Sequence, residues 1–369
     1  MKFFRIIFQS FFLTIHIVIV ILFLLAALSD RISPETFTLG AYLGLGFPVF
    51  CILNLCLTCY WLFTQEWRFI WIGLLSFLLC WGQVKLYFPF HSQVDDIPQE
   101  NTIKLLTYNI MAFGYKPHTK ENPNPTIDYI TRSGADIVCL QEYAEDTQSK
   151  FLTKKKIYKE LDMYPYRSIV YLNRAGRLRY GIAVFSKYPI EKSRRIKYDS
   201  RYNGSAVHTI RVKDKKITLI NNHLESFKLT SEDRSKYASF IKEMDSESFG
   251  NLKGTIQQKL GAAFKIRAAQ ARSVAKAIAD SSNEYTIVCG DFNDTPISYA
   301  HHTIGKGLTD AFSASGRGMG ISYNSYNENF FWFRIDHILC SPNIKPYNCT
   351  VEHVDYSDHY PMWCYLQLE

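Results

Sequence analysis

The first 90 of the 369 residues are strongly apolar and nearly uncharged, and this feature constrains the fold more than any other. Apolar runs cover about 4–28, 39–63 and 67–88, and each approaches the roughly 20 apolar residues that cross a bilayer as a helix. Tryptophans lie toward the ends of these runs, as interfacial aromatic residues do. The pattern predicts a three-helix transmembrane segment over residues 1–90. The lipid bilayer is then a partner, and the chain is an integral protein of the inner or plasma membrane.

A cleavable signal peptide is the alternative interpretation of the first apolar run. The run is longer than the apolar core of a signal peptide, and residues 26–29 (AALS) form a poor cleavage site. Lys2 and Arg5 precede the run and favour a cytoplasmic N-terminus, whereas Arg31 opposes it. Three crossings from a cytoplasmic N-terminus place the remainder of the chain outside the cytoplasm.

The remainder of the chain carries most of the charge and is long enough for a large core. Residues 91–101 are polar and predict a linker, and residues 102–369 predict a globular domain. The formal net charge is +8, and the first 90 residues hold five basic and three acidic residues, which leaves +6 for the rest. That bias is compatible with a polyanionic substrate or with anionic lipid headgroups. The nine cysteines show no spacing typical of metal ligands; Cys340 and Cys349 either pair or remain buried thiols.

Short apolar runs typical of buried strands recur after residue 102, and polar residues suited to metal or phosphate chemistry follow them. One such run, 286–289, is expected to stop at Gly290. The polar residues at the ends of the runs are Asn109, Glu142, His223, Asp291 and Asn293. Such residues also form ordinary turns, but their repetition at strand ends favours a site.

Three further polar residues extend this set near the C-terminus. Asp336 lies inside a predicted strand, where a carboxylate without a partner would be costly. Asp358 and His359 lie in a loop directly before another apolar run.

These residues, in this order, resemble the motifs of the endonuclease/exonuclease/phosphatase superfamily, which has the DNase I-like fold. The motifs are TYNI at Asn109, LQE at Glu142, GIAVFSKYPI at Gly181, NNHLES at His223, GDFND at Asp291, RIDHIL at Asp336 and SDHYP at Asp358. The resemblance implies an α/β (α+β) fold in which two mainly antiparallel sheets form a β-sandwich flanked by helices. It also implies hydrolysis of a phosphoester that depends on Mg²⁺, with Mn²⁺ as the alternative ion.

The resemblance assigns the metal site to Glu142 and Asp358, with Asn109 binding either the metal or a phosphate oxygen. Carboxylate and amide oxygens are hard ligands that suit Mg²⁺. Substrate binding falls to Asn109, His223 and Asn293.

The catalytic roles implied by the resemblance fall on five residues. Asp291 orients or deprotonates the attacking water, and Asn293 holds either a phosphate oxygen or that carboxylate. His359 donates to a phosphoryl oxygen or acts as the base, and Asp336 pairs with it and favours its protonated form. His223 contacts the phosphate. His337 points away from Asp336 in a regular strand, which indicates a structural role.

Two segments have more than one interpretation. The mixed-charge insertion at 228–261 is interpreted as a substrate lid, as a helix that lies against the membrane, or as a solvated helix. The aromatic cluster at 330–333 indicates core packing, with contact to substrate or bilayer as the alternative.

The leading hypothesis is a membrane-anchored, Mg²⁺-dependent phosphodiesterase or phosphatase. Tethering to a bilayer favours a lipid-linked phosphoester, and the charge of +6 favours nucleic acid, with Lys154–Lys156 and Arg174, Arg177 and Arg179 as candidate contacts. The alternative is a catalytically inactive binding module with the same fold. No obligate protein partner is inferred.

Overall fold

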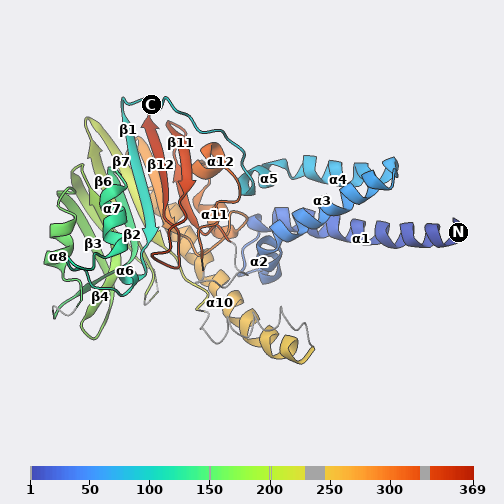
Figure 1. Ribbon diagram of the computed structural model, residues 1–369, viewed down its shortest axis with the longest axis horizontal. Coiled ribbons are helices and arrows are strands. Elements are labelled where there is room, and N and C mark those ends of the chain that lie inside the picture. The colour runs from blue at the N-terminus through green and yellow to red at the C-terminus, as the bar shows by residue number, and fades with distance from the viewer. Residues whose placement is uncertain (1, 149–150, 199, 201, 229–245, 325–332) are drawn as a thin grey trace.

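The structure is a computed structural model of residues 1–369, and it describes all of them except 1, 149–150, 199, 201, 229–245 and 325–332. A two-sheet sandwich forms one end of the molecule, and a bundle of apolar helices projects from its side (Figure 1). Residues 330–332 of the aromatic cluster and 229–245 of the insertion lie outside the described residues.

The first sheet has six strands in the order β11-β12-β1-β2-β4-β3. Its members are β1 (Thr102–Asn109), β2 (Ile137–Asp146), β3 (Tyr166–Ala175), β4 (Leu178–Ser186), β11 (Ile344–Val351) and β12 (Met362–Leu368). The second sheet has the order β5-β6-β7-β8-β10-β9. Its members are β5 (Ile190–Ile196), β6 (Gly204–Val212), β7 (Lys215–His223), β8 (Tyr285–Asp291), β9 (Thr309–Asp310) and β10 (Asp336–Cys340).

Both sheets are mixed. The pairs β1–β2 and β7–β8 are parallel, and the other pairs are antiparallel. The prediction of two mainly antiparallel sheets flanked by helices is confirmed.

Alternate residues of the central strands fill the space between the sheets. Ile103 and Leu105 of β1 share one buried cluster with Ile217 and Leu219 of β7. This alternation follows from the two-residue period of a strand, which sends successive side chains to opposite faces. Both faces of a central strand such as β8 are buried, one between the sheets and one under helices, so these strands appear in the sequence as continuous apolar runs.

Helices cover the outer faces of both sheets. They are α6 (Met111–Gly114), α7 (Pro125–Arg132), α8 (Lys154–Glu160), α10 (Ser246–Ala279) and α11 (Tyr299–Ile304). Helix α12 (Ala311–Ser315) instead packs Ala311 and Phe312 into the cluster between the sheets. On the first sheet, Ile127 of α7 packs in one cluster with Leu106 and Val138. On the second sheet, α10 buries Ala271 and Val274 in one cluster with strand residues of β7 and β8.

The apolar N-terminal segment differs from its prediction. Its elements are α1 (Lys2–Leu28), a 3₁₀ turn (Ser29–Arg31), α2 (Thr38–Leu45), α3 (Phe47–Phe63), α4 (Trp67–Leu79) and α5 (Trp81–Tyr87). The prediction of three continuous spans is wrong. Within the described residues, only the helix at 3–31 is long and apolar enough to cross a membrane by itself. Each of the predicted spans 39–63 and 67–88 breaks into two helices, with bends of 55° and 71° respectively. Either pair crosses a membrane only if its two bent helices together form one span.

The first of these breaks has a visible cause. Pro48 occupies the first turn of α3, and its nitrogen carries no hydrogen to donate to the carbonyl of Gly44. The second break, at Cys80, contains no proline.

Polar side chains join three helices inside the bundle. The indole Nε1 of Trp61 donates to Nδ1 of His16 at 2.9 Å. Because indole can only donate, the proton of His16 lies on Nε2, which donates to Oδ1 of Asn54 at 3.0 Å. Asn54 in turn donates to Oγ of Ser76 at 2.8 Å. These buried groups satisfy one another and fix the packing of α1, α3 and α4.

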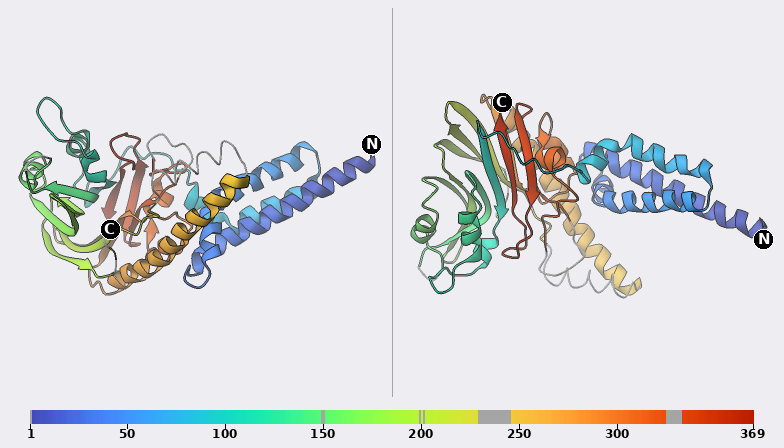
Figure 2. Two further views of the ribbon diagram at one scale, coloured as in Figure 1. Left: turned by 90° about the horizontal axis from the view of Figure 1, so that it is seen from below. Right: turned by 45° about the horizontal axis from the view of Figure 1, so that its top comes forward.

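The bundle docks directly onto the sandwich, as Figure 2 shows from two further sides. Ile297 of the sandwich packs in one buried cluster with Phe47 and Tyr87 of the bundle. The guanidinium of Arg272 pairs with Glu35 at 2.8 Å. Apolar packing and an ion pair therefore hold the two parts together.

Gly290 lies inside β8 and does not end it, because β8 continues to Asp291. Its φ is +122°, and a Cβ there would lie 2.1 Å from the carbonyl oxygen of Asn222 on β7. Only glycine allows β7 and β8 to approach this closely.

We expect Gly290→Ala to lower the free energy of unfolding by more than about 3 kcal/mol, because it adds a backbone clash to an unfavourable φ. Gly134→Ala is the matched control, since Gly134 has a φ of +67° and open space around its Cβ position. The control should lose only about 1–2 kcal/mol. Thermal unfolding of both variants measures this, and equal losses would contradict the close approach.

Candidate active site

The polar strand ends meet at one edge of the sandwich. Asn109 is the last residue of β1, His223 the last of β7 and Asp291 the last of β8. His223 pairs in register with Asp291, and Asp291 pairs in register with Asp336, the first residue of β10. The ladder of the second sheet therefore sets three predicted site residues in one row.

Asp291 is held by neutral N–H groups. Its Oδ1 accepts from the backbone of Asn293 at 2.7 Å, and its Oδ2 accepts from Nδ2 of Asn109 and Nδ2 of Asn293, both at 3.1 Å. The second hydrogen of the Asn293 amide goes to the carbonyl of Leu224 at 2.9 Å. Of the two roles predicted for Asn293, the structure places it on the carboxylate of Asp291, because both of its amide hydrogens are used.

The pKa of Asp291 is raised to about 6. Burial is the largest cause, and the negative charge of Asp336 adds to it, while the histidines at positions 359 and 223 act in the opposite direction. A carboxyl group of this kind accepts a proton more readily than an exposed one.

His359 faces Asp336 with one ring nitrogen and Asp291 with the other. Its Nδ1 lies 2.8 Å from Oδ2 of Asp336, and its Nε2 lies 3.6 Å from Oδ2 of Asp291. Burial alone would lower the pKa of His359, but the two carboxylates outweigh burial and raise it well above its usual value. A protonated imidazole with Nε2–H directed into the site follows from this arrangement.

His223 lies between the carboxylates of Glu142 and Asp291. Its Nε2 is 3.8 Å from Oε1 of Glu142 and 3.8 Å from Oδ2 of Asp291, beyond hydrogen-bond distance. Burial lowers the pKa of His223, which favours a neutral ring that can donate one hydrogen bond.

Glu142 and Asp358 provide two carboxylates on the other side. Glu142 has a φ of +50° where the pairing of β2 with β4 shifts register, and 37% of its side chain is exposed. Removal from water and the negative charge of Asp358 raise the pKa of Glu142. Two partly buried carboxylates that repel each other are a donor set that fits a hard divalent cation such as Mg²⁺.

Asn109 lies between Asp291 and Glu142. Its Nδ2 donates to Oε1 of Glu142 at 3.3 Å as well as to Asp291, and its Oδ1 accepts from the backbone of Met111 at 3.2 Å. Both amide hydrogens of Asn109 are therefore used within the site, as those of Asn293 are.

A second set of side-chain amides, which the sequence motifs did not identify as part of the site, lies beneath it. Nε2 of Gln141 donates to Oδ1 of Asn221 at 2.7 Å, and Asn221 donates to the carbonyls of Leu140 and Ala183. Both side chains are fully buried. The signal was present in the sequence, since Gln and Asn interrupt otherwise apolar strands in LQE and NNHLES.

The chain after Asn109 makes a left-handed turn. Residues Met111–Tyr115 all have φ between 42° and 64°. A left-handed conformation costs about 1–2 kcal/mol for each residue that is not glycine, and Gly114 is the only glycine among these five. The turn leads to Tyr115, whose pKa is raised by burial and by its contacts with Tyr180 and the site carboxylates. Nothing in the sequence pattern indicates this conformation.

His337 points to the opposite face of β10 from Asp336. Its Nε2 contacts the carbonyl of Asp294 at 2.9 Å, and it lies beside His301 and Asp310 in a buried cluster. The guanidinium of Arg334 lies 3.9 Å from Asp310. This cluster sits away from the reacting groups, in agreement with a structural role for His337.

The sequence model of the Endonuclease/Exonuclease/phosphatase family matches residues 106–359, more than half of the chain. The chain belongs to this family. Residues 9–87 match a second model, described as a domain of unknown function (DUF8431). No curated protein matches the sequence.

Solved structures of the family share the fold. The endonuclease/exonuclease/phosphatase from Beutenbergia cavernae DSM 12333 is 15% identical over 73% of this chain and 72% of its own, with a TM-score of 0.51. A family protein from Leptotrichia buccalis C-1013-b is 16% identical over 72% of this chain and 99% of its own, with a TM-score of 0.50. At these identities the likeness concerns the DNase I-like fold alone.

We expect Asp336→Asn to lower the pKa of His359 by at least about one unit, because it removes the opposite charge closest to the ring. Titration of the imidazole resonances by NMR measures the shift. His208 is an internal control, since burial on β6 holds its pKa at about 4 independently of the site. An unchanged pKa at His359 would show that Asp336 does not stabilise its protonated form.

Proposed function

We propose that this protein is a membrane-anchored, Mg²⁺-dependent phosphodiesterase. The observation that carries the proposal is the arrangement of Asp291 against the His359–Asp336 pair on one side and the carboxylates of Glu142 and Asp358 on the other. Hydrolysis of a phosphoester needs an aimed water, a neutralised phosphoryl group and a stabilised leaving oxygen.

Asp291 is the residue proposed to orient the water and accept its proton. Its two oxygens are positioned by Asn109 and Asn293, so it has little freedom to turn. With a pKa near 6, it is mostly ionised at neutral pH and is a stronger base than an exposed aspartate.

The two histidines are proposed to hold the phosphoryl oxygens. His359 keeps a proton on Nε2 because Asp336 binds its Nδ1. His223, whose pKa is lowered by burial, adds a neutral N–H donor. Mg²⁺, bound by Glu142 and Asp358, would neutralise the phosphoryl charge and stabilise the leaving oxygen.

The apolar bundle supports anchoring in a bilayer. Large apolar side chains on its outer surface are exposed, among them Phe4, Phe63 and Leu79 at 75%, 84% and 74%. A lipid environment would cover such a surface. We propose an inner or plasma membrane location with the N-terminus in the cytoplasm and the catalytic domain outside.

A lipid-linked phosphoester is favoured over nucleic acid as the substrate. Two of the arginines considered for nucleic acid contacts pair with carboxylates: Arg177 with Asp146 at 3.1 Å, and Arg179 with Glu145. The charges of these two arginines are therefore largely neutralised, whereas the bundle keeps the site beside a lipid surface.

We expect the full-length protein to hydrolyse bis(p-nitrophenyl) phosphate with Mg²⁺ and to lose this activity with EDTA. Asp291→Ala should lower kcat at least about a hundredfold, because the water loses its acceptor. Asp214→Ala, in the exposed turn between β6 and β7, is the matched control and should keep wild-type activity. A metal-loaded wild-type protein that is inert on diesters, lipids, nucleic acids and phosphomonoesters would instead favour the inactive binding module.

The orientation has its own test in sealed membrane vesicles. Trypsin should cleave the catalytic domain in right-side-out vesicles and leave it intact in inside-out vesicles, because the exposed Lys213, in the turn before β7, lies outside the cytoplasm in the proposed topology. Immunoblotting of the C-terminal fragment measures protection. The reverse pattern would place the domain in the cytoplasm.

A further inference from the structure

Helix α10 places a fully buried arginine next to the catalytic strand ends. Arg267 is 0% exposed, although arginine is almost never buried completely without partners. Its Nε donates to Oδ2 of Asp294 at 3.0 Å, and its Nη1 donates to the carbonyl of Glu225 at 2.8 Å. The guanidinium also lies 4.3 Å from the ring centre of Phe227 and 5.1 Å from that of Phe264. Because a buried ion pair often adds little to stability, the value of this arginine lies in the segments that it connects.

Those segments are the two that leave the central strands of the second sheet. Glu225 is the second residue after β7, which ends at His223, and Asp294 is the third residue after β8, which ends at Asp291. His223 and Asp291 pair in register, and the backbone of Leu224 donates to the carbonyl of Asp291 at 2.9 Å. The strands end there, so side chains must hold the two segments together beyond this point.

Asn293 makes the first of these side-chain connections. Its Nδ2 donates to the carbonyl of Leu224 at 2.9 Å and to Oδ2 of Asp291 at 3.1 Å. Asn293 has a φ of +51°, a left-handed conformation that persists only where its surroundings hold it. The two bonds of Arg267 lie one residue further along each segment, so they form a second connection next to the first.

The helix that carries Arg267 is itself held at several points. One turn later, Oε1 of Gln270 accepts from the backbone of Glu225 at 2.8 Å, so α10 binds both backbone groups of Glu225. On the side of the bundle, the ring of Phe264 contacts the ring of Tyr42 in α2, with centres 5.3 Å apart. A helix that is fixed against both parts of the molecule is a rigid support for a catalytic group.

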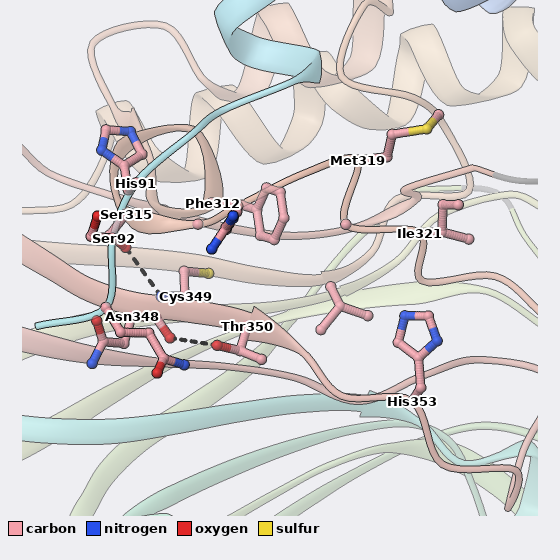
Figure 3. A pocket seen from close by; sticks show the side chains of 15 residues that line it. His91, Ser92, Phe312, Ser315, Met319, Ile321, Asn348, Cys349, Thr350 and His353 are labelled. Carbon is pink, nitrogen blue, oxygen red and sulfur yellow. Dashed lines mark hydrogen bonds between the residues drawn. The ribbon is translucent and has the colours of Figure 1, made fainter.

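The cavity drawn in Figure 3 offers no comparable support. It has a volume of about 690 Å³ and lies between residues 91–93, the loop at 315–321 and β11 with the residues after it. None of the described residues that line it is one of the site residues. The packed contacts of α10 therefore bear on Asp291 more directly than this open space does.

We propose that Arg267 is a positioning residue that keeps Asn293 on the carboxylate of Asp291. The inference rests on the proposed function, in which that carboxylate orients the attacking water. Without Arg267, the two segments would separate, the amide of Asn293 would lose its carbonyl partner, and the carboxylate would be free to turn. A guanidinium suits this task because its N–H groups point in fixed directions, whereas the ammonium of lysine is a single point charge.

Steady-state kinetics of the full-length protein on bis(p-nitrophenyl) phosphate test the inference. Arg267→Lys keeps the charge but not the two directed N–H groups, and it should lower kcat about tenfold while KM changes less than about twofold. In the Asn293→Ala background the same substitution should lower kcat less than about twofold, because its target is already absent. Arg272→Lys is the matched control on the same helix: it pairs with Glu35 of the bundle and should keep wild-type kcat.

A purely structural role is separated by a pair of substitutions. Arg267→Met leaves Asp294 buried without its partner and should lower the temperature of thermal unfolding. Adding Asp294→Leu removes the second charge and should return the unfolding temperature toward that of the wild type, whereas kcat should remain at least about tenfold low. Recovery of kcat together with stability would show that Arg267 only stabilises the fold, and it would overturn the inference.

The side-chain amide of Asn293 gives a readout that needs no turnover. Its NMR signal is assigned by its loss in Asn293→Ala, and its exchange with water should be at least about tenfold faster in Arg267→Lys, because a hydrogen bond is released. Unchanged exchange, or an equal loss of kcat from Arg267→Lys in both backgrounds, would contradict the positioning role. A wild-type protein that lacks diesterase activity while Arg267→Lys speeds the exchange would refute the proposed function and leave the connection through Arg267 standing.

Discussion

Hydrogen bonds across the interface between the two sheets hold the site together. Asn109 belongs to the first sheet and donates to Asp291 of the second. Gln141 and Asn221 make a second connection between the sheets beneath it. Because a buried amide without a partner costs about 1–3 kcal/mol, sliding one sheet along the other would be penalised at each of these groups. The amides therefore fix the relative position of two sheets whose apolar cores alone would tolerate small shifts.

Two buried aspartates acquire different roles from their surroundings. Asp336 contacts Nδ1 of His359 at 2.8 Å, whereas Asp291 is held by neutral amide groups and has a pKa near 6. At pH 7 a pKa of 6 leaves roughly ten ionised Asp291 groups for each protonated one. In the proposed function, Asp336 serves as a counter-charge for His359 and Asp291 as the proton acceptor, although both lie at ends of neighbouring strands.

The parts of the molecule that were readable from the sequence are those set by local patterns. Short continuous apolar runs located β1 and β8, and the polar residues that end them located Asn109 and Asp291. The pairing of Arg179 with Glu145 and the left-handed turn at 111–115 depend on contacts distant in the sequence or on backbone strain. The break at Cys80 also lacks a local signal. The roles of the site residues remain predictions, because geometry brings them together without showing a reaction.

The junction between bundle and sandwich limits what can reach the site. Arg334 is buried, donates to the carbonyl of Leu86 at the end of the bundle, and stacks on Phe312 of α12. It lies two residues before Asp336, so the segment that contacts α5 continues directly into the strand that carries the partner of His359. Because the amide of Asn348 also holds the backbone of Val94, the domain has little freedom to swing away from the bundle. If the bundle is embedded in a bilayer, a rigid attachment of this kind keeps the catalytic edge close to the lipid surface, and a substrate that diffuses within that surface meets it more often than one dissolved in bulk water.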